Sequence, residues 1–342
     1  MLTLRKQRIL QAVVDEYVKT PVPVSSHGVV NRLPVSVSPA TVRNDMAELE
    51  EDGYLMRPHA SAGGVPSDKG YRAYIGFLGA IPEPSPHVKR SIRLRFEQGH
   101  MDVEAWSRMA SQLLAGVAHT MAICTPPRAP EARWKQLNLV QVQEFLALLV
   151  MVLRESRLRQ QLLPLKEPVT QEQLTQVANK LNVVFSSLSR SEIRAKNVEL
   201  TPLESDITGV ALALLSEYQR DKFPDYYVDG LRHLFSQAEM TPPSRAREIA
   251  ELLEDRQVMQ SVLGEAPEAG EVRVAIGSEN RPEALHSFSI VLAQYGVPSE
   301  ASGMVGIMGP TRMEYSTAIS SVRYLASVMG DMLEMVQGRA SN

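Results

Sequence analysis

A run of hydroxyl, guanidinium and amide side chains opens residues 38–55, which read SPATVRNDMAELEEDGYL. The Asn44 amide can pair in a bidentate manner with adenine, and the Arg43 guanidinium with guanine or with a phosphate. The hydroxyls of Ser38 and Thr41 suit phosphate oxygens, which position a protein on the duplex without reading its sequence. These residue types, close together in the chain, predict a helix end that contacts DNA.

The same segment has two faces when it is wound at about 100° per residue. Val42, Met46 and Leu49 share an apolar stripe that must face a core, whereas Asn44 points outward. Small alanine residues flank Asn44 on the outer face and would let the helix backbone approach a groove. The pattern therefore predicts a recognition helix that enters the major groove with its N-terminal half.

The far end of this helix is acidic, with Glu48, Glu50, Glu51 and Asp52. Only the N-terminal half of a recognition helix normally reaches base edges, so carboxylates beyond it do little harm. Our hypothesis is that the acidic half projects past the groove. Glu48 and Glu51 would then repel misplaced backbone phosphates and sharpen the register.

The flanking sequence predicts the elements that hold this helix. Thr3, Ser38 and Ser67 are placed as N-caps, and Pro39 suits the first helical position. We expect helices at 4–19, from 25 or 26 to 33, 38–52 and 67–78, and short strands at 54–57 and 65–66. Three helices followed by a small hairpin and a further helix indicate a winged helix-turn-helix.

The predicted wing and the helix after it carry further candidates for contact with the DNA backbone. These candidates are Arg57, His59, Ser61, Lys69, Tyr71 and Arg72. Core packing is an equally good interpretation of Tyr71, and a solvated helix face is an equally good one of Lys69.

The remaining chain alternates between mixed and helical stretches. Linkers are expected at 80–86 and 265–271, strands at 134–142, 145–153, 159–165, 272–276, 288–295 and 304–308, and helices at 87–120, 170–188 and 313–336. Residues 192–262 read as mostly helical. The pattern is typical of one α/β domain that is interrupted by a helical insertion.

Composition and motifs exclude several classes of protein. The 342 residues have a net charge of −3 and one cysteine, Cys124, which fits a reducing cytoplasm and excludes an intramolecular disulfide. We see no signal peptide and no apolar run long enough to span a bilayer. Common nucleotide-binding, hydrolase and metalloprotease motifs are missing, and the seven histidines form no close pair. We therefore expect no enzyme, metal or cofactor.

Six segments in a fixed order resemble one known family. They are PVSS (23–26), SPATVRNDMAELEEDGYL (38–55), HASAGGVPSDKGYR (59–72), YVDGL (227–231), IGSEN (276–280) and GMVGIMGPTRMEY (303–315). Together they resemble HrcA, the bacterial heat-inducible transcription repressor family, over nearly the whole chain. The chain departs from the family's usual wing at positions 60, 64, 65 and 67. The glycine at 64 puts in doubt a basic contact near the wing tip.

The resemblance implies an α+β multidomain fold with three domains and one linking segment. They are a winged helix-turn-helix (1–79), a linker and helix (80–104), a GAF-like α/β domain (105–191 and 265–338), and inside it a mostly helical dimerisation domain (192–264). Apolar residues of that insertion are expected to serve partly its core and partly a partner subunit. The candidates for dimerisation are Val210, Leu214, Leu231, Leu234 and Phe235.

The resemblance also implies a function. The family represses chaperone operons of the groE and dnaK type by binding an inverted repeat called CIRCE. An inverted repeat requires two wings related by a two-fold axis, so we expect a homodimer on double-stranded DNA. The GroE chaperonin is thought to keep such a repressor active, and heat withdraws that help.

Two other functions remain open at this stage. One is a ligand-responsive repressor of another regulon, with the GAF-like domain as sensor. The glycine-rich segment 303–315 could place an anion at the start of the helix that follows, although such glycines more often allow close packing. The other is a dimerising scaffold whose winged helix binds protein.

Overall fold

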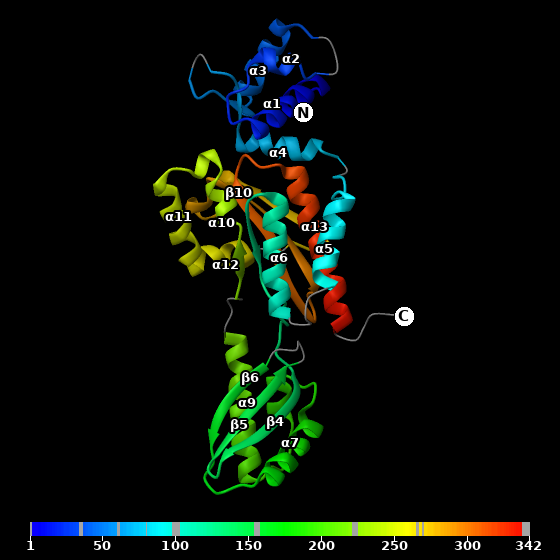
Figure 1. The fold of residues 1–342 in the computed structure, drawn as a ribbon, viewed down its shortest axis with the longest axis vertical. Helices are drawn as coiled ribbons and strands as arrows, with labels where there is room; N and C mark the ends of the chain where they lie inside the picture. Colours follow the sequence, from blue (N-terminus) through cyan, green and yellow to red (C-terminus); the bar gives the residue numbers. More distant parts are fainter. Residues whose placement is uncertain are drawn as a thin grey trace. The chain divides into compact units, whose positions relative to one another are not determined.

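The computed structural model describes residues 2–33, 37–59, 62–79, 81–97, 103–153, 158–220, 225–264, 267–268 and 270–336. Their contacts divide the chain into two compact units, drawn in Figure 1. Unit 1 comprises 1–126, 225–296 and 303–342, and unit 2 comprises 127–224 and 297–302. The inserted unit therefore starts and ends earlier than the 192–264 segment that we expected from the sequence.

The N-terminal part of unit 1 is the winged helix-turn-helix expected from the sequence. Its elements are α1 (Leu4–Lys19), α2 (Ser26–Val30), α3 (Pro39–Glu51), β1 (Leu55–Met56), β2 (Val65–Pro66) and α4 (Asp68–Phe77). Side-chain oxygens of Thr3, Ser25, Ser38 and Ser67 accept hydrogen bonds from the first turns of the four helices. Each helix thus begins where a capping residue satisfies a free backbone N–H.

The glycine at 64 lies at the base of the wing rather than at its tip. Gly64 is buried and exchanges two backbone hydrogen bonds of 2.9 Å with Val24. A Cβ atom at this position would lie 3.0 Å from the Met46 methyl and 3.3 Å from Leu55. The doubt that Gly64 raised about a contact at the wing tip is therefore not supported, because this position faces the core.

The rest of unit 1 is built on a five-stranded sheet in the order β7-β3-β10-β9-β8. Its strands are β3 (Met121–Cys124), β7 (Tyr227–Asp229), β8 (Val272–Ile276), β9 (Phe288–Val297) and β10 (Ala301–Pro310). Helices α5 (Pro86–Glu97), α6 (Val103–Ala118) and α13 (Tyr315–Val336) form one layer that packs against it (Figure 1). The middle strands β3, β9 and β10 are buried along most of their length, so both faces of the sheet are covered.

The chain's cysteine lies in the middle of this sheet. Cys124 is fully buried on β3 and pairs with Val305 of β10. Burial raises the pKa of the Cys124 thiol to about 12, and nearby hydroxyls offset only part of that effect. The thiol is therefore protonated and unreactive in the folded protein.

Four short helices connect β7 to β8. They are α10 (Leu231–Phe235), η1 (Ala238–Met240), α11 (Pro243–Glu254) and α12 (Arg256–Gly264). Two further 3-10 turns, η2 (Gly277–Glu279) and η3 (Glu283–Leu285), lead from β8 into β9. The helices of 225–264 belong to unit 1, although we expected the inserted domain to cover 192–264.

Unit 2 contains a three-stranded antiparallel sheet as well as helices. Its elements are β4 (Trp134–Gln143), β5 (Leu146–Leu153), β6 (Leu158–Pro164), α7 (Gln171–Phe185), α8 (Arg190–Ala195) and α9 (Pro202–Arg220). The Asn182 side chain of α7 accepts hydrogen bonds from the Trp134 indole and the Leu137 N–H, at 2.9 and 2.7 Å. The three helices share one apolar core with one face of the sheet (Figure 1).

The other face of this sheet is apolar and open. Residues of β5 alternate between buried and half-buried, as expected for a strand covered on one side. The large apolar side chains that are 46–63% exposed on and beside the sheet are Val140, Val142, Phe145, Leu158 and Leu162. The paired rows Val140–Leu148–Leu162, Asn138–Val150–Gln160 and Gln136–Val152–Leu158 contain no charged residue. We call these three rows the open face.

The five expected dimerisation residues are split between the two units. Leu214 is 5% exposed in the core of unit 2, and Leu234 is fully buried in unit 1. Val210, Leu231 and Phe235 are half-buried. Leu214 and Leu234 are therefore corrected to core residues, because helical periodicity cannot distinguish a face that meets its own core from one that meets a partner.

Neither a membrane span nor a metal centre is found in the part of the chain that the structure describes. No helix there is both long and apolar enough to cross a bilayer. No group of three or more histidine, cysteine or acidic side chains in the same residues could hold a metal ion.

Candidate nucleic-acid interface

The recognition helix α3 presents the predicted side chains on its exposed surface. Val42, Met46 and Leu49 are buried, at 0, 6 and 0% exposure, so the opposite face is free. Arg43 and Asn44 are exposed, and neither forms a hydrogen bond or an ion pair with another described residue. Both side chains are therefore exposed opposite the apolar stripe, and their contact with base edges stays a prediction.

The two hydroxyls at the start of α3 serve the helix itself. The Ser38 Oγ accepts a hydrogen bond from the Thr41 N–H at 3.1 Å and lies 2.8 Å from the Thr41 Oγ1. This cap satisfies one of the free N–H groups of the first turn. Ser38 is exposed and Thr41 is half-buried, so a phosphate can reach Ser38 more easily than Thr41.

Three of the four carboxylates at the acidic end of α3 lie near cations of the winged helix. Lys6 Nζ lies 2.7 Å from a Glu48 carboxylate oxygen and 3.9 Å from one of Asp52. Arg57 Nε lies 2.8 Å from a carboxylate oxygen of Glu50. Glu48 is thus already paired with Lys6, and the hypothesis that Glu48 and Glu51 repel misplaced phosphates stays a prediction.

The predicted wing contacts are partly used by the domain itself. Arg57 is paired with Glu50 and remains one-third exposed at its side chain. The Lys69 ammonium donates to the Asp52 carbonyl at 2.7 Å and lies 4.5 Å from the centre of the Tyr54 ring. His59 is exposed, whereas Ser61 lies outside the described residues.

Tyr71 and Arg72 face the GAF-like part of unit 1. Tyr71 is 2% exposed, and its ring centre lies 5.6 Å from that of Tyr315 in α13. The Arg72 Nε donates to Glu279 at 2.8 Å, and its Nη2 donates to the Val274 carbonyl at 2.6 Å. The structure supports the core-packing interpretation of Tyr71. Arg72 helps to dock α4, but its side chain stays 43% exposed, so its contact with DNA stays a prediction.

Other contacts complete this docking surface, which we define as the contacts of α1 and α4 with residues 274–315. The Ser278 N–H and hydroxyl donate to Asp68 of α4, at 2.9 and 2.8 Å. Arg312 donates to the Val18 carbonyl at the end of α1 and also pairs with Glu239. The docking surface thus combines a buried aromatic pair with charged hydrogen bonds.

Two of its charged groups have shifted pKa values. Burial alone would raise the pKa of Glu279, but hydrogen bonds from Arg72 and the Ile276 N–H outweigh it and hold that pKa below its usual value. The hydrogen bond to Glu279 raises the pKa of Arg72 in turn. Both groups therefore stay charged near neutral pH.

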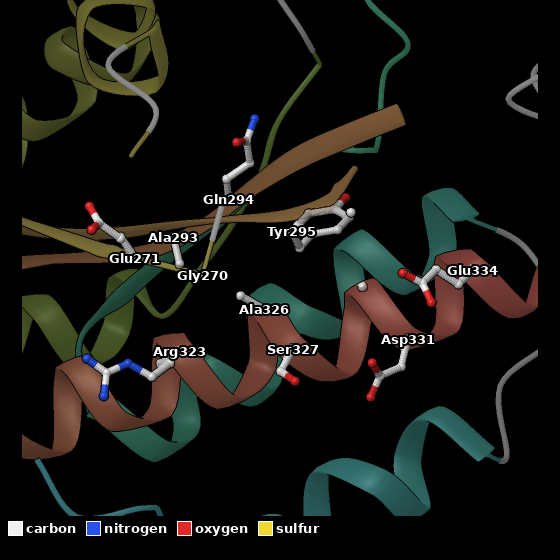
Figure 2. Close-up of a pocket in the computed structure, with 12 residues that line it drawn as sticks. Gly270, Glu271, Ala293, Gln294, Tyr295, Arg323, Ala326, Ser327, Asp331 and Glu334 are labelled. Atoms are coloured by element: carbon white, nitrogen blue, oxygen red, sulfur yellow. The ribbon is translucent and has the colours of Figure 1, made fainter. Parts of the chain in front are cut away.

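An open pocket of about 370 Å³ lies between β9 and α13 (Figure 2). Its volume is at the lower end of small-molecule sites. Figure 2 shows its lining. The lining includes Arg323, Ser327, Asp331 and Glu334 from α13, and Glu271, which directly precedes β8. The pocket therefore has more negative than positive side chains.

The glycines of segment 303–315 serve close packing. A Cβ atom at Gly303, Gly306 or Gly309 would overlap Tyr295, the Val291–Leu292 backbone or the Thr120 hydroxyl, respectively. Side chains would therefore separate β10 from its neighbours. This observation favours the packing interpretation over an anion site before α13.

Comparison with known proteins identifies the family. The chain matches the family model described as the HrcA protein C terminal domain over residues 104–319 and that of the DeoR-like helix-turn-helix domain over residues 5–69. The chain belongs to the HrcA family of heat-inducible transcription repressors. A repressor of this name from Dehalococcoides mccartyi is 34% identical, with 99% of this chain and 98% of that protein covered. One from Herpetosiphon aurantiacus is 36% identical, with 98% and 97% covered.

A solved structure supports the fold. A crystal structure described as a hypothetical protein at 2.2 Å resolution shares 21% identity and a TM-score of 0.61, with 98% of both chains covered. The HrcA family consists of transcription repressors with a DNA-binding helix-turn-helix and not of enzymes. The α+β multidomain fold with a winged helix-turn-helix and a GAF-like domain is thereby confirmed.

Sequence reasoning missed one group of side chains next to the recognition helix. Asp45 of α3 is 3% exposed and accepts two hydrogen bonds from Arg5 of α1. A signal was present, because Arg5 and Lys6 place positive charge in the first turn of a helix, where acidic residues are preferred.

Proposed function

We propose that this repressor binds the CIRCE inverted repeat as a homodimer and so represses chaperone operons of the groE and dnaK type. The observation that carries the proposal is the exposed pair Arg43 and Asn44 in the N-terminal half of α3. Arginine and asparagine are suited to bidentate recognition of guanine and adenine. Membership of the HrcA family supports the proposal that the repressed operons encode chaperones.

We infer that the two subunits meet through the open face of unit 2. Its exposed apolar side chains, Val140, Leu158 and Leu162 among them, sit among uncharged neighbours. Interface centres are depleted of charged residues, and large exposed apolar patches mark protein contacts. Such a contact would bring two winged helices into one assembly, as an inverted repeat requires.

We also propose that GroE chaperonin maintains the active repressor and that heat withdraws this help. The support is the resemblance to the family. The expected result is that the DNA-binding activity of the purified protein falls after heating and returns when GroE and ATP are added. Full activity after heating without chaperonin would contradict this proposal.

The pocket in Figure 2 supports a second candidate, a repressor of another regulon that responds to a small ligand. Its acidic lining around Arg323 suits an amine or an amino acid. A panel of such compounds should then raise the melting temperature, and Asp331→Asn should reduce the effect. If no compound shifts the melting temperature, this candidate fails.

Binding to a duplex that carries the inverted repeat, compared with a scrambled duplex at several salt concentrations, tests the main proposal. We expect a specific excess of at least about 10³, as is typical of operators. Asn44→Ala should remove about 1–3 kcal/mol of that excess, whereas Asn197→Ala, at an exposed asparagine of unit 2, should not. Equal binding to both duplexes would contradict the proposal that the inverted repeat is the operator. Absence of any salt-dependent binding would favour the alternative of a dimerising scaffold whose winged helix binds protein.

A further inference from the structure

Two helices of the winged helix carry charges that oppose their own dipoles. The first turn of α1 contains no acidic residue and holds Arg5 and Lys6. The last turn of α3 contains no basic residue and carries Glu48 and its acidic neighbours. A helix dipole favours acids at the N-terminus and bases at the C-terminus, so each helix is locally disfavoured. Local conflicts of this kind in natural proteins commonly mark functional or strained sites.

The two conflicts are resolved by pairing the helices with each other. The Arg5 guanidinium donates through Nε and Nη2 to the two Asp45 oxygens, at 2.6 and 3.0 Å. One turn farther along α3, Lys6 pairs with Glu48 at 2.7 Å. The Asp45 side chain is 4% exposed, and its bidentate pair with Arg5 fixes orientation as well as distance.

The pair lies directly beside the side chains that would read DNA. Asp45 follows Asn44 in sequence, and Asp45 and Glu48 are three residues apart on one flank of α3. The apolar stripe that contains Val42 and Leu49 holds the helix against the core but permits sliding and rotation, because apolar contact has little directionality. The ion pairs along the flank therefore fix the rotation and position of α3, which the apolar stripe alone does not.

We propose that Arg5 is a positioning residue for operator recognition. By holding Asp45, it sets the orientation of α3 and thereby the place where Asn44 meets a base edge. Arg5 acts through Asp45 and makes no required contact with DNA. The inference rests on the proposed function, since it assigns a role within the same interface.

A double-mutant cycle tests this role. Arg5→Ala, Asp45→Asn and the double variant are each measured on the inverted-repeat duplex and on the scrambled duplex, below the lowest melting temperature of the set. We expect Arg5→Ala to reduce the specific excess at least about tenfold and to add no further loss in the Asp45→Asn protein, because coupled residues are not additive. Arg8→Ala, on the same helix, is the matched control for loss of one positive charge and should keep the excess.

A second variant keeps the test informative if Arg5→Ala does not fold. Arg5→Lys keeps the charge but loses the bidentate geometry, so we expect a partial loss of the specific excess with an unchanged salt slope. Two results would show that Arg5 contacts a phosphate and would overturn the inference. They are additive losses in the double-mutant cycle, or a salt slope of binding that falls by about 0.9 in Arg5→Ala. A wild-type protein without specific excess would instead overturn the proposed function.

Discussion

The two sheets of this protein are covered to different extents. In unit 1, β9 and β10 are buried along nearly their whole length, with helices packed on the sheet. In unit 2, β5 is covered on one side only, and Leu158 and Leu162 of β6 are more than half exposed. Apolar surface is worth about 25 cal/mol per Å² when it leaves water, so only the second sheet has a large gain still available. The difference separates a sheet that stabilises the fold from a sheet suited to assembly.

The largest effect should follow a charge placed in the covered sheet. Val305 is fully buried opposite Cys124, so Val305→Asp buries a carboxylate that has no partner. We expect a loss of more than about 4 kcal/mol in the free energy of unfolding, which is enough to unfold unit 1. Circular dichroism and urea unfolding measure it. A folded variant with the wild-type midpoint of urea unfolding would show that this sheet is not fully covered.

The same substitution on the open face should spare the fold and disrupt the dimer. Leu162 is 55% exposed, so Leu162→Asp should change the unfolding free energy of the subunit by less than about 1 kcal/mol. We expect dimer dissociation to become at least about tenfold easier, because a charge at an interface centre is poorly tolerated. Analytical ultracentrifugation over a concentration series measures this. An unchanged dimer would place the subunit contact elsewhere.

A smaller effect is expected at the edge of the covered sheet, where α4 docks. The pKa of Glu279 is held below its usual value, so its contribution to stability is present above about pH 4.3 and is lost as pH falls through the folded-state pKa. Glu279→Gln should therefore flatten the fall of the melting temperature between about pH 5 and 3. Glu283→Gln serves as a control in the next turn. Parallel curves for Glu279→Gln and wild type would contradict the role of this carboxylate.

The smallest effect should come from the buried aromatic pair of the docking surface. The Tyr71 hydroxyl is buried, and no described residue bonds to it. Burial raises the pKa of Tyr71 far above its ordinary value, so the group stays neutral. Tyr71→Phe removes an unsatisfied polar atom and should leave the melting temperature unchanged or raise stability by less than about 1 kcal/mol. A clear loss would reveal a partner for the hydroxyl.

Local features of the fold could be predicted well from the sequence. The caps at Thr3, Ser38 and Ser67 gave three helix starts, because capping depends on neighbouring residues alone. Strands at 134–142 and 288–295 were also identified from their apolar content. The exposed Arg43 and Asn44 followed from helical phase, which the burial of Val42 and Leu49 confirms.

Features that depend on distant partners could not be predicted in the same way. Residue type and position made Tyr71 and Arg72 candidates for DNA contact, but they could not show that Tyr315 and Glu279 lie opposite. For the same reason, the sequence could not show that the strands at 134–165 form a sheet of their own in unit 2. Strand pairing is set by the partner strand, and the pattern of one strand does not name it.

The buried cysteine can report the opening of the covered sheet when the protein is heated. Cys124 lies at the centre of the covered sheet, and its protonated thiol cannot react with a maleimide while β3 stays between β7 and β10. Labelling would then proceed only through molecules whose sheet has opened, at a rate that follows the population of the open state. Because the chain has no other thiol, the unmodified repressor could be followed through a heat shock without an added dye or a substitution.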